Sequence, residues 1–408
     1  MPTIEIDKPK PARNVWPTDK LERRAQALAR VEAVADRLAA EVQASETDRR
    51  ISKASVEALL EAGVLGIMTP DDVGGNVLDP VSAFLVIERI GRIDPALAWT
   101  ATILLEGACS LATYLPAERV SAVFGGPRLP LKAGSLRPGT AVPADGGYRL
   151  NGTWDFASGI HHSDFVSAAF WITEPTTGAT ERRAALIPTD EVTILDDWRT
   201  LGMRGTGSTS FALDDQFVPT AMVFNPFDGP VRHDTPLARL GMTPFVLQMH
   251  QGMALGAARR ALDELMVLAA TRRPGSRINT EIRPTLAEET WFQREIGELD
   301  ARVRAARAWS MATLEQLDEV ISTGRPVELQ LLDLLQTCSS HAAKTAAEVV
   351  GRAFRHAGSA AISDSNIFQK VLRDINTICA HAVLGEVGFE MHGEFLLGLQ
   401  TPENRRMV

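Results

Sequence analysis

The order of helix-like and strand-like sequence patterns along the chain constrains the fold more than any single motif. Apolar residues recur with a helical period over residues 20–127, short strand-like runs separated by turns fill residues 128–232, and the helical period returns over residues 233–408. The chain lacks the strand-helix alternation of a parallel α/β sheet. The sequence therefore predicts an N-terminal helical domain, a central β-barrel or sandwich domain and a C-terminal four-helix bundle, after a flexible tail over residues 1–19.

Helix boundaries are clearest in the first domain. Ser52 can cap a helix that Gly63 stops, because a hydroxyl accepts hydrogen bonds from free backbone N–H groups and glycine adopts the left-handed conformation. Asp79 followed by Pro80 predicts another helix start, since proline suits the first helical turn. The C-terminal helices are apolar on more than one face, which predicts a bundle that also buries surface between subunits.

The central region begins with a predicted hairpin. Strand-like residues flank Asn151-Gly152, a dipeptide that supplies the two positive φ angles of a type I′ turn. Further strand-like runs follow between turn-rich segments. The sequence therefore places a tight turn in front of the run TWDFAS.

Composition limits the location and the partners of the protein. The net charge of −9 argues against nucleic-acid binding, since phosphate contacts need clustered Lys and Arg. No apolar run reaches the roughly 18 residues of a membrane helix, and the start of the chain lacks the apolar core of a signal peptide. Cys109, Cys338 and Cys379 match neither a disulfide framework nor a zinc spacing. These features predict a cytoplasmic protein that makes no membrane contact.

Two longer strings resemble the acyl-CoA dehydrogenase superfamily. The string EALLEAGVLGIMTPDDVGG, residues 57–75, is similar to an N-terminal helix and loop of that superfamily. The string DDWRTLGMRGTGSTSFALDDQFVP, residues 196–219, is similar to the end of its β domain. Both stand in the expected order in a resemblance that covers about residues 20–400. An acyl-CoA dehydrogenase-like fold is therefore expected.

Within that superfamily the sequence resembles the flavin-dependent monooxygenases, the two-component aromatic hydroxylases and their relatives. The dehydrogenases use a glutamate as the base next to a thioester carbonyl, but the C-terminal region has no Glu between Glu348 and Glu386. The features that resemble the hydroxylases are AGSLRPGTA at 133–141, GTWDFASG at 152–159, and Arg373 and Asp374 followed by His381.

The resemblance implies roles for several residues around a flavin. Ser158 falls where a hydroxyl meets the flavin N5 edge, and Phe156 flanks the isoalloxazine ring. Ser135 matches a position that lines the flavin or substrate pocket. His381 matches a histidine near the flavin C4a that assists oxygen activation.

Two further parts of the chain are expected near the flavin, a glycine-rich loop and an arginine. The loop GMRGTGS at 202–208, which ends in Ser208, lacks the lysine of a phosphate-binding P-loop and is expected to form a tight turn beside the flavin. Arg272 or Arg273 is expected to reach the flavin phosphate, within this chain or across a subunit boundary.

Three residues are candidates for the substrate pocket. Trp154 can furnish an apolar wall, and one of His161 and His162 can line the pocket. The two histidines do not predict a metal site, because adjacent residues on a strand point to opposite faces. The helix before the β domain also lacks the histidine that binds a phenol in some of the hydroxylases.

The implied chemistry needs the N5 proton to stay in place. Reduced flavin and O2 form a C4a-hydroperoxide, which collapses to H2O2 when that proton is lost. A hydrogen bond from N5–H to Ser158, worth about 0.5–1.5 kcal/mol, would hold the proton. A protonated His381 would stabilise the developing peroxide.

The sequence therefore predicts a monooxygenase that inserts one oxygen atom from O2 into a small aromatic or heteroaromatic substrate. FMN or FAD would arrive in reduced form from a separate flavin reductase, since the chain carries no NAD(P)H fingerprint. The resemblance also implies a homotetramer. Two alternatives stay open: an acyl-CoA dehydrogenase or oxidase whose base is Glu264 or Glu295, and a non-catalytic helical scaffold.

Overall fold

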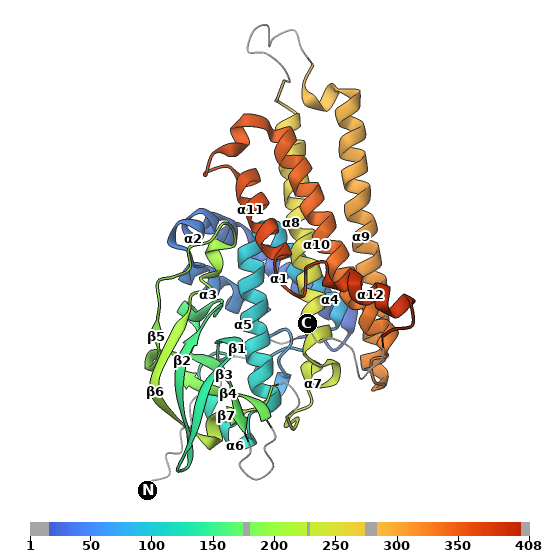
Figure 1. Ribbon diagram of the computed structural model, residues 1–408. Helices are drawn as coiled ribbons and strands as arrows, with labels where there is room; N and C mark the ends of the chain where they lie inside the picture. The colour runs from blue at the N-terminus through green and yellow to red at the C-terminus, as the bar shows by residue number, and fades with distance from the viewer. Residues whose placement is uncertain (1–15, 174–179, 227–228, 274–283, 401–408) are drawn as a thin grey trace.

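A computed structural model describes residues 16–173, 180–226, 229–273 and 284–400. Most of the predicted tail, residues 1–15, lies outside the described residues. The expected order of a helical domain, a β domain and a second helical domain is confirmed (Figure 1).

The N-terminal domain consists of helices and short turns. The helices are α1 (Lys20–Ala40), α2 (Val42–Asp48), α3 (Lys53–Glu61), α4 (Pro80–Ile93), α5 (Pro95–Tyr114) and α6 (Ala117–Val123). Two predicted caps are confirmed, because the Ser52 side chain accepts from the Ser55 N–H and the Asp79 side chain accepts from the Ser82 N–H. Gly63 follows α3 with a φ of 76°, as expected for a glycine that ends a helix.

The β domain is one mixed sheet of seven strands in the order β5-β6-β2-β1-β3-β4-β7, where the sequence predicted a barrel or sandwich. The strands are β1 (Lys132–Ala144), β2 (Gly147–Trp154), β3 (Phe165–Thr173), β4 (Thr180–Pro188), β5 (Thr193–Ile194), β6 (Phe211–Pro219) and β7 (Val223–Phe224). Among the described strands, only β1 and β3 pair in parallel. The sheet has an apolar core of its own, which includes Trp154 and Phe170, while Ala184 and Leu186 belong to the helical core.

The predicted hairpin turn at Asn151-Gly152 is wrong. Strand β2 runs through both residues, and its pairing with β6 shifts register there, which marks a bulge. The chain turns earlier, at Asp145-Gly146, where Gly146 has a φ of 74°. Continued pairing with β6 outweighs the local preference of Asn-Gly, because a strand with a buried face has its register fixed by that face.

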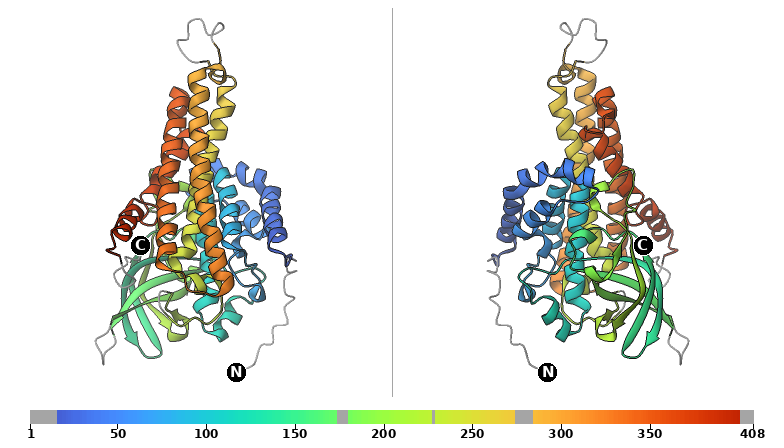
Figure 2. Two further views of the ribbon diagram at one scale, coloured as in Figure 1. Left: turned by 90° about the vertical axis from the view of Figure 1, so that its right-hand side faces the viewer. Right: turned by 90° about the vertical axis from the view of Figure 1, so that its left-hand side faces the viewer.

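The C-terminal domain is built on three long helices. Its helices are α7 (Pro236–Leu240), α8 (Met242–Ala269), α9 (Thr290–Thr323), α10 (Leu329–Ala357), α11 (Ile367–Cys379) and α12 (Val387–Leu396). Helices α8, α9 and α10 pack side by side and extend well beyond the sheet and the N-terminal helices (Figure 2). Helix α11 returns along the bundle toward α5.

Helix α5 stands between the sheet and the long helices (Figure 1). It is long and apolar enough to cross a membrane, which corrects the expectation that no such run exists. However, 83% of its apolar window is buried inside the protein. Helix α5 therefore has the packing of a core helix, and it brings its side chains to the junction of all three domains.

Candidate functional site

Three hydroxyl side chains meet between the end of β2 and the loop before β6. Ser158 Oγ lies 2.6 Å from Ser208 Oγ, which lies 2.6 Å from Thr206 Oγ1. Thr206 Oγ1 donates to the Met203 carbonyl oxygen at 2.9 Å, and Trp99 Nε1 donates to Ser158 Oγ at 3.1 Å. We call the three buried hydroxyls of Ser158, Ser208 and Thr206 the hydroxyl relay. Ser158 and Ser208, both predicted to lie beside the flavin, are thus in direct contact.

Counting hydrogens gives the direction of each bond in the hydroxyl relay. A hydroxyl has one hydrogen to donate and two lone pairs. Thr206 donates its hydrogen to Met203, so Ser208 must donate to Thr206, and Ser158 must then donate to Ser208. One lone pair of Ser158 receives the Trp99 N–H. Ser158 is left with one free lone pair and no free hydrogen, so it can accept one further bond and donate none.

The backbone around the hydroxyl relay is held in unusual conformations. Phe156 has a φ of 60° and Gly159 a φ of 75°, and the Ser158 N–H donates to the Phe156 carbonyl oxygen at 2.9 Å. The left-handed region is costly for phenylalanine and open to glycine. Gly207 has a φ of 54°, and a Cβ there would lie 3.1 Å from the His161 ring. These turns direct Ser158 toward α5.

Phe156 leaves an aromatic face open beside Ser158. The Phe156 side chain is 61% exposed, and its ring meets Trp198 edge-on with centroids 6.1 Å apart. A flat ring can stack on such a face while an N–H at its edge reaches a nearby acceptor. Ser135 is buried on β1 and accepts the Arg137 N–H at 3.3 Å. The open ring and the single free acceptor of Ser158 fit a reduced flavin.

Two histidines complete the surroundings of Trp99. The His381 ring, just after α11, lies edge-on to Trp99 with centroids 4.9 Å apart. The His250 ring, on α8, lies 5.0 Å from Trp99 and stacks with His381 at 5.8 Å. Trp99 therefore joins Ser158 to His381, although more than two hundred residues separate them in the sequence.

Burial favours the neutral form of both histidines. Desolvation, together with the neighbouring His381, lowers the pKa of His250 to about 3. His250 Nδ1 contacts the Val246 carbonyl oxygen at 2.9 Å, so Nδ1 carries the hydrogen and buried Nε2 is an acceptor without a partner among the described residues. Desolvation also lowers the pKa of His381, although the residue keeps an exposed side. Burial therefore favours the neutral form of His381 over the protonated imidazole.

Trp154 and the adjacent histidines lie outside this cluster. Trp154 is fully buried in the sheet, where it stacks on Phe211 with centroids 5.5 Å apart. Its contact with a substrate stays a prediction. His161 and His162 lie in a short 3-10 turn, Ile160–His162, and not on a strand as assumed. His162 Nε2 contacts the Ile51 carbonyl oxygen at 2.7 Å.

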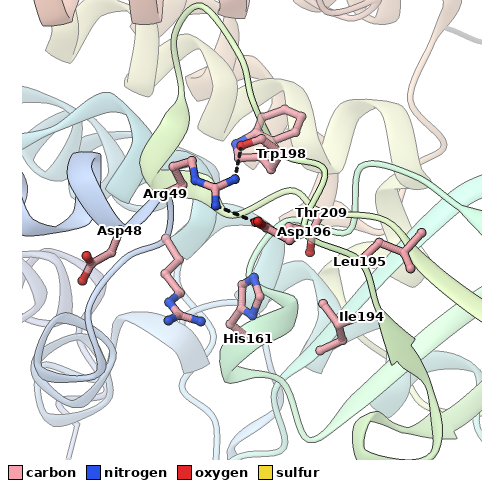
Figure 3. A pocket seen from close by; sticks show the side chains of 9 residues that line it. Asp48, Arg49, His161, Ile194, Leu195, Asp196, Trp198 and Thr209 are labelled. Atoms are coloured by element: carbon pink, nitrogen blue, oxygen red, sulfur yellow. Dashed lines mark hydrogen bonds and ion pairs between the residues drawn. The ribbon is translucent and has the colours of Figure 1, made fainter.

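His161 borders a separate pocket of about 390 Å³ (Figure 3). The lining residues are Asp48, Arg49, Arg50, His161, Ile194, Leu195, Asp196, Trp198 and Thr209. Arg49 donates to the Asp196 carboxylate at 2.5 Å and to the Trp198 carbonyl oxygen at 3.2 Å, so its charge is already paired. Within the described ranges no group of three potential metal ligands occurs, here or elsewhere.

Arg272 lies at the far end of the bundle. It follows the last turn of α8, and a side chain at Gly358, just after α10, would collide with its guanidinium. The end of α8 lies far along the bundle from α5 (Figure 1). One chain therefore does not bring Arg272 to Ser158. Its role toward a flavin phosphate stays a prediction.

The alternative catalytic bases are committed to ion pairs. Glu264 pairs with Arg260 at 2.8 Å on α8. Glu295 pairs with Arg352 at 2.5 Å and with His356 at 2.9 Å, and the hydrogen bond from Arg352 lowers the pKa of Glu295 to about 2. A carboxylate held in its ionised form by arginine is a weak base. Neither glutamate contacts Trp99 or the hydroxyl relay.

Sequence reasoning missed Trp99 and His250. Each stands in a long apolar helix, where a polar group that becomes buried needs a partner. Two glutamines close to His250 in the sequence, Gln248 and Gln251, are also fully buried. A polar run in the middle of an apolar helix is the signal that could have found it.

Comparisons with known proteins agree with this architecture. Residues 21–115 match the family model described as acyl-CoA dehydrogenase, N-terminal domain. Residues 248–386 match the model described as acyl-CoA dehydrogenase, C-terminal domain. The two matches lie in the two helical domains, and neither includes the sheet that stands between these domains in the sequence.

Relatives along the whole length are oxygenases. The chain is 29% identical over 374 residues to an indole-3-acetate monooxygenase of Pseudomonas putida, covering 90% of this chain and 93% of the relative. It is 27% identical over 394 residues to the oxygenase component of a FADH2-dependent resorcinol hydroxylase of a Rhizobium species, covering 91% and 94%.

Solved structures show the same fold. XiaF from a Streptomyces species, in complex with FADH2 and glycerol, superposes with a TM-score of 0.85 at 25% identity, covering 95% of this chain and 98% of XiaF. TdsC from a Paenibacillus species, with FMN and indole, has a TM-score of 0.78 at 22% identity, covering 92% and 98%. Because the two acyl-CoA dehydrogenase models together match more than half of the chain, the chain belongs to the acyl-CoA dehydrogenase superfamily, and its relatives there include flavin-dependent monooxygenases.

Proposed function

We propose that this protein is the oxygenase component of a two-component system that inserts one oxygen atom from O2 into a small aromatic or heteroaromatic substrate. A reductase supplies FMN or FAD in the reduced form. The proposal rests on the direction of the hydroxyl relay, which leaves Ser158 with a free acceptor and no free donor.

That direction distinguishes the two redox states of a flavin. Position N5 carries a hydrogen in the reduced flavin and is an acceptor in the oxidised one. Ser158 can accept the N5–H of a reduced flavin. It has no hydrogen to donate to N5 of an oxidised flavin, because its only hydrogen goes to Ser208. The site is therefore built for the reduced state, which supports a monooxygenase over a dehydrogenase that binds oxidised flavin to receive a hydride.

A bound reduced flavin supplies the electrons that activate O2. Ser158 would hold the hydrogen at N5, and the exposed Phe156 would offer its ring to the flat flavin. His381 lies within ring contact of Trp99, and it is placed to hydrogen-bond oxygen on the side of α11. Trp99 and the buried, neutral His250 surround His381 with uncharged rings, and low polarity strengthens each polar contact there.

Relatives support the substrate class. One is named for indole-3-acetate and another for resorcinol. Both compounds are small and aromatic.

Assembly and location extend the proposal. Exposed apolar side chains follow closely on one another at the end of α12, at Leu396, Leu397 and Leu399, each more than 60% exposed. Patches of this kind mark interfaces between proteins, which supports a homotetramer in which Arg272 serves a neighbouring subunit's flavin. A cytoplasmic location suits a protein that takes reduced flavin from a reductase.

The test uses the purified protein with anaerobically reduced FMN or FAD, an aromatic substrate and ¹⁸O2. One labelled oxygen atom in the product is expected for a monooxygenase. Tight binding of oxidised flavin that bleaches with an acyl-CoA supports a dehydrogenase instead, and absence of flavin binding supports a scaffold. Either of the last two results overturns the proposal.

A further inference from the structure

The pocket beside His161 contains two polar side chains that the fold leaves without a partner. Its volume of about 390 Å³ is enough for a small molecule, and the side chains of Arg50 and His161 both line it. Neither makes a hydrogen bond or an ion pair with any other described residue. Arg49 differs, because its guanidinium is held by Asp196 and by the Trp198 carbonyl oxygen. Arg50 is therefore the arginine of this pocket that is open to a ligand.

A contact between the next residues along the chain sets Arg50 beside His161. His162 Nε2 contacts the Ile51 carbonyl oxygen at 2.7 Å, and these two residues directly follow His161 and Arg50. Gly207 permits the close approach, because a Cβ there would lie 3.0 Å from the Arg50 Cβ and 3.1 Å from the His161 ring. Gly207 has a φ of 54°, which glycine adopts readily. The backbone therefore fixes the relative position of the two side chains.

The surroundings of His161 favour a negative ligand. Desolvation lowers the pKa of His161, and the positive charge of Arg50 is the strongest charge that lowers it further. Asp196 opposes this shift, but its carboxylate already pairs with Arg49 at 2.5 Å. Asp48 also lines the pocket, and its carboxylate points away from His161 (Figure 3). A neutral imidazole still has one N–H to donate, so an anion can bind Arg50 and His161 together.

Thr209 adds a buried hydroxyl to the same pocket. Its side chain is 3% exposed, and Oγ1 has no hydrogen-bond partner in the part of the chain that the structure describes. A buried hydroxyl without a partner is costly, and an acceptor that enters from the pocket would remove that cost. A guanidinium, an imidazole N–H and a hydroxyl are all hydrogen-bond donors. The ligand that suits all three is an acceptor with negative charge.

Apolar side chains form the rest of the lining and limit the choice of anion. Ile194, Leu195 and Trp198 line the pocket and are only partly buried by the fold. Covering apolar surface is favourable, and an aromatic ring can also stack on the indole of Trp198. A small inorganic anion would leave this surface in contact with water. The lining therefore fits an anion that carries a ring.

We propose that this pocket is a second ligand site, apart from the flavin site, and that it binds a small aromatic carboxylate. Arg50 pairs with the carboxylate, because a planar guanidinium matches its two oxygens. His161 and Thr209 each donate one hydrogen bond, and the ring of the ligand covers Trp198. The site goes beyond the proposed oxygen transfer and does not depend on it.

The test measures equilibrium binding of benzoate to the full-length, flavin-free protein by calorimetry. One benzoate per chain is expected. Benzamide has the same shape without the charge and should bind about tenfold or more weakly, as for the loss of a hydrogen bond to a charged group. Acetate lacks the ring and should also bind about tenfold or more weakly, because it covers less apolar surface. Saturating indole should leave the affinity for benzoate unchanged, because an uncharged ring does not engage Arg50.

Three variants separate the contributions of the side chains. Arg50→Gln should weaken benzoate binding by about tenfold or more, and Arg50→Lys should keep part of the affinity because the charge remains. Thr209→Val keeps the shape of the side chain and should weaken binding by about fivefold, as for one neutral hydrogen bond. Arg294→Gln is the matched control, since it removes an exposed arginine on α9 and should bind benzoate as the wild-type protein does. Circular dichroism melting of each variant checks folding.

Several results would overturn the inference. Failure of the wild-type protein to bind benzoate, or equal affinity for benzamide, would remove the carboxylate site. An unchanged affinity in Arg50→Gln, or displacement of benzoate by indole, would place the binding elsewhere. Inorganic phosphate that binds more tightly than benzoate would contradict the aromatic carboxylate as the ligand. No flavin or O2 enters these measurements, so each result leaves the proposed oxygen transfer untouched.

Discussion

Asp374 Oδ1 accepts a hydrogen bond from the backbone N–H of Met203 at 2.6 Å, and the carbonyl oxygen of Met203 is the last acceptor of the hydroxyl relay. Met203 has a φ of 56°, which a residue other than glycine rarely adopts. Asp374 is fully buried and pairs with Lys370 at 2.7 Å, and Lys370 also binds Asp94, the N-cap of α5. One carboxylate thus connects α11, α5 and the loop that sets the direction of the relay.

Replacing Asp374 should disturb oxygen transfer only because the Met203 loop loses its support. Asp374→Ala leaves the Met203 N–H without its acceptor and Lys370 with one partner fewer, at a cost of about 3 kcal/mol in the free energy of unfolding. The loosened loop should raise the share of O2 released as H2O2, measured with peroxidase against product formed. Asp374→Asn keeps an acceptor oxygen and should restore much of the coupling. Equal leakage in both variants would contradict a positioning role.

Removing the Ser208 hydroxyl should change which flavin redox state binds best. In Ser208→Ala, Ser158 loses the acceptor of its hydrogen and can turn that hydrogen toward an oxidised N5. The preference for reduced over oxidised flavin should fall by about tenfold, the value of roughly 1.4 kcal/mol for one hydrogen bond gained or lost. Dissociation constants of both flavin states, measured anaerobically by fluorescence, give the ratio.

The matched control is Ser210→Ala. Ser210 is also buried near the same loop, and its backbone N–H donates to Asp197, but its hydroxyl is not part of the hydroxyl relay. Its flavin preference should equal that of the wild-type protein. A Ser208→Ala protein with an unchanged ratio would show that the direction of the relay does not select the redox state.

The sequence predicted the features that local rules decide. Ser52 and Asp79 cap helices because their side chains bond to N–H groups three residues ahead, and that reach is visible in the sequence. Asn151-Gly152 failed as a turn because pairing with β6, about sixty residues away, fixes the strand. Local preference is weak where a long-range partner decides the backbone.

The candidate site shows the same division. Ser158 and His381 came from a resemblance to relatives, whereas Trp99, which joins them, did not. Its contacts reach Ser158 over 59 residues and His381 over a longer span, and no spacing in the sequence encodes such contacts. Packing of α5 against both other domains creates them. The direction of the relay also depends on one backbone carbonyl, that of Met203, which composition cannot reveal.

Acid should destabilise the protein through His250. Its pKa is about 3 in the folded state against 6.5 for an ordinary histidine, so the unfolded state binds more protons between these values. Stability therefore rises with pH across this window and falls on acidification below about 6.5, by up to about 1.4 kcal/mol per pH unit from this residue. Urea unfolding at pH 5 and pH 7 should show a smaller pH difference for His250→Phe. An identical difference in the variant would mean that His250 is not held neutral.

Removing the imidazole of His381 should slow the reaction with O2. His381→Asn keeps a polar side chain of smaller size beside Trp99 but cannot transfer a proton at neutral pH. A positioned acid or base is worth about 100-fold or more in rate, so O2 consumption by the protein loaded with reduced flavin should slow by that order in a stopped-flow oxygen measurement. His233→Asn removes an imidazole that pairs with Asp72 at 3.3 Å, away from Trp99, and should react at the wild-type rate. If both variants consume O2 equally fast, His381 takes no part in oxygen activation and its contact with Trp99 is one of packing.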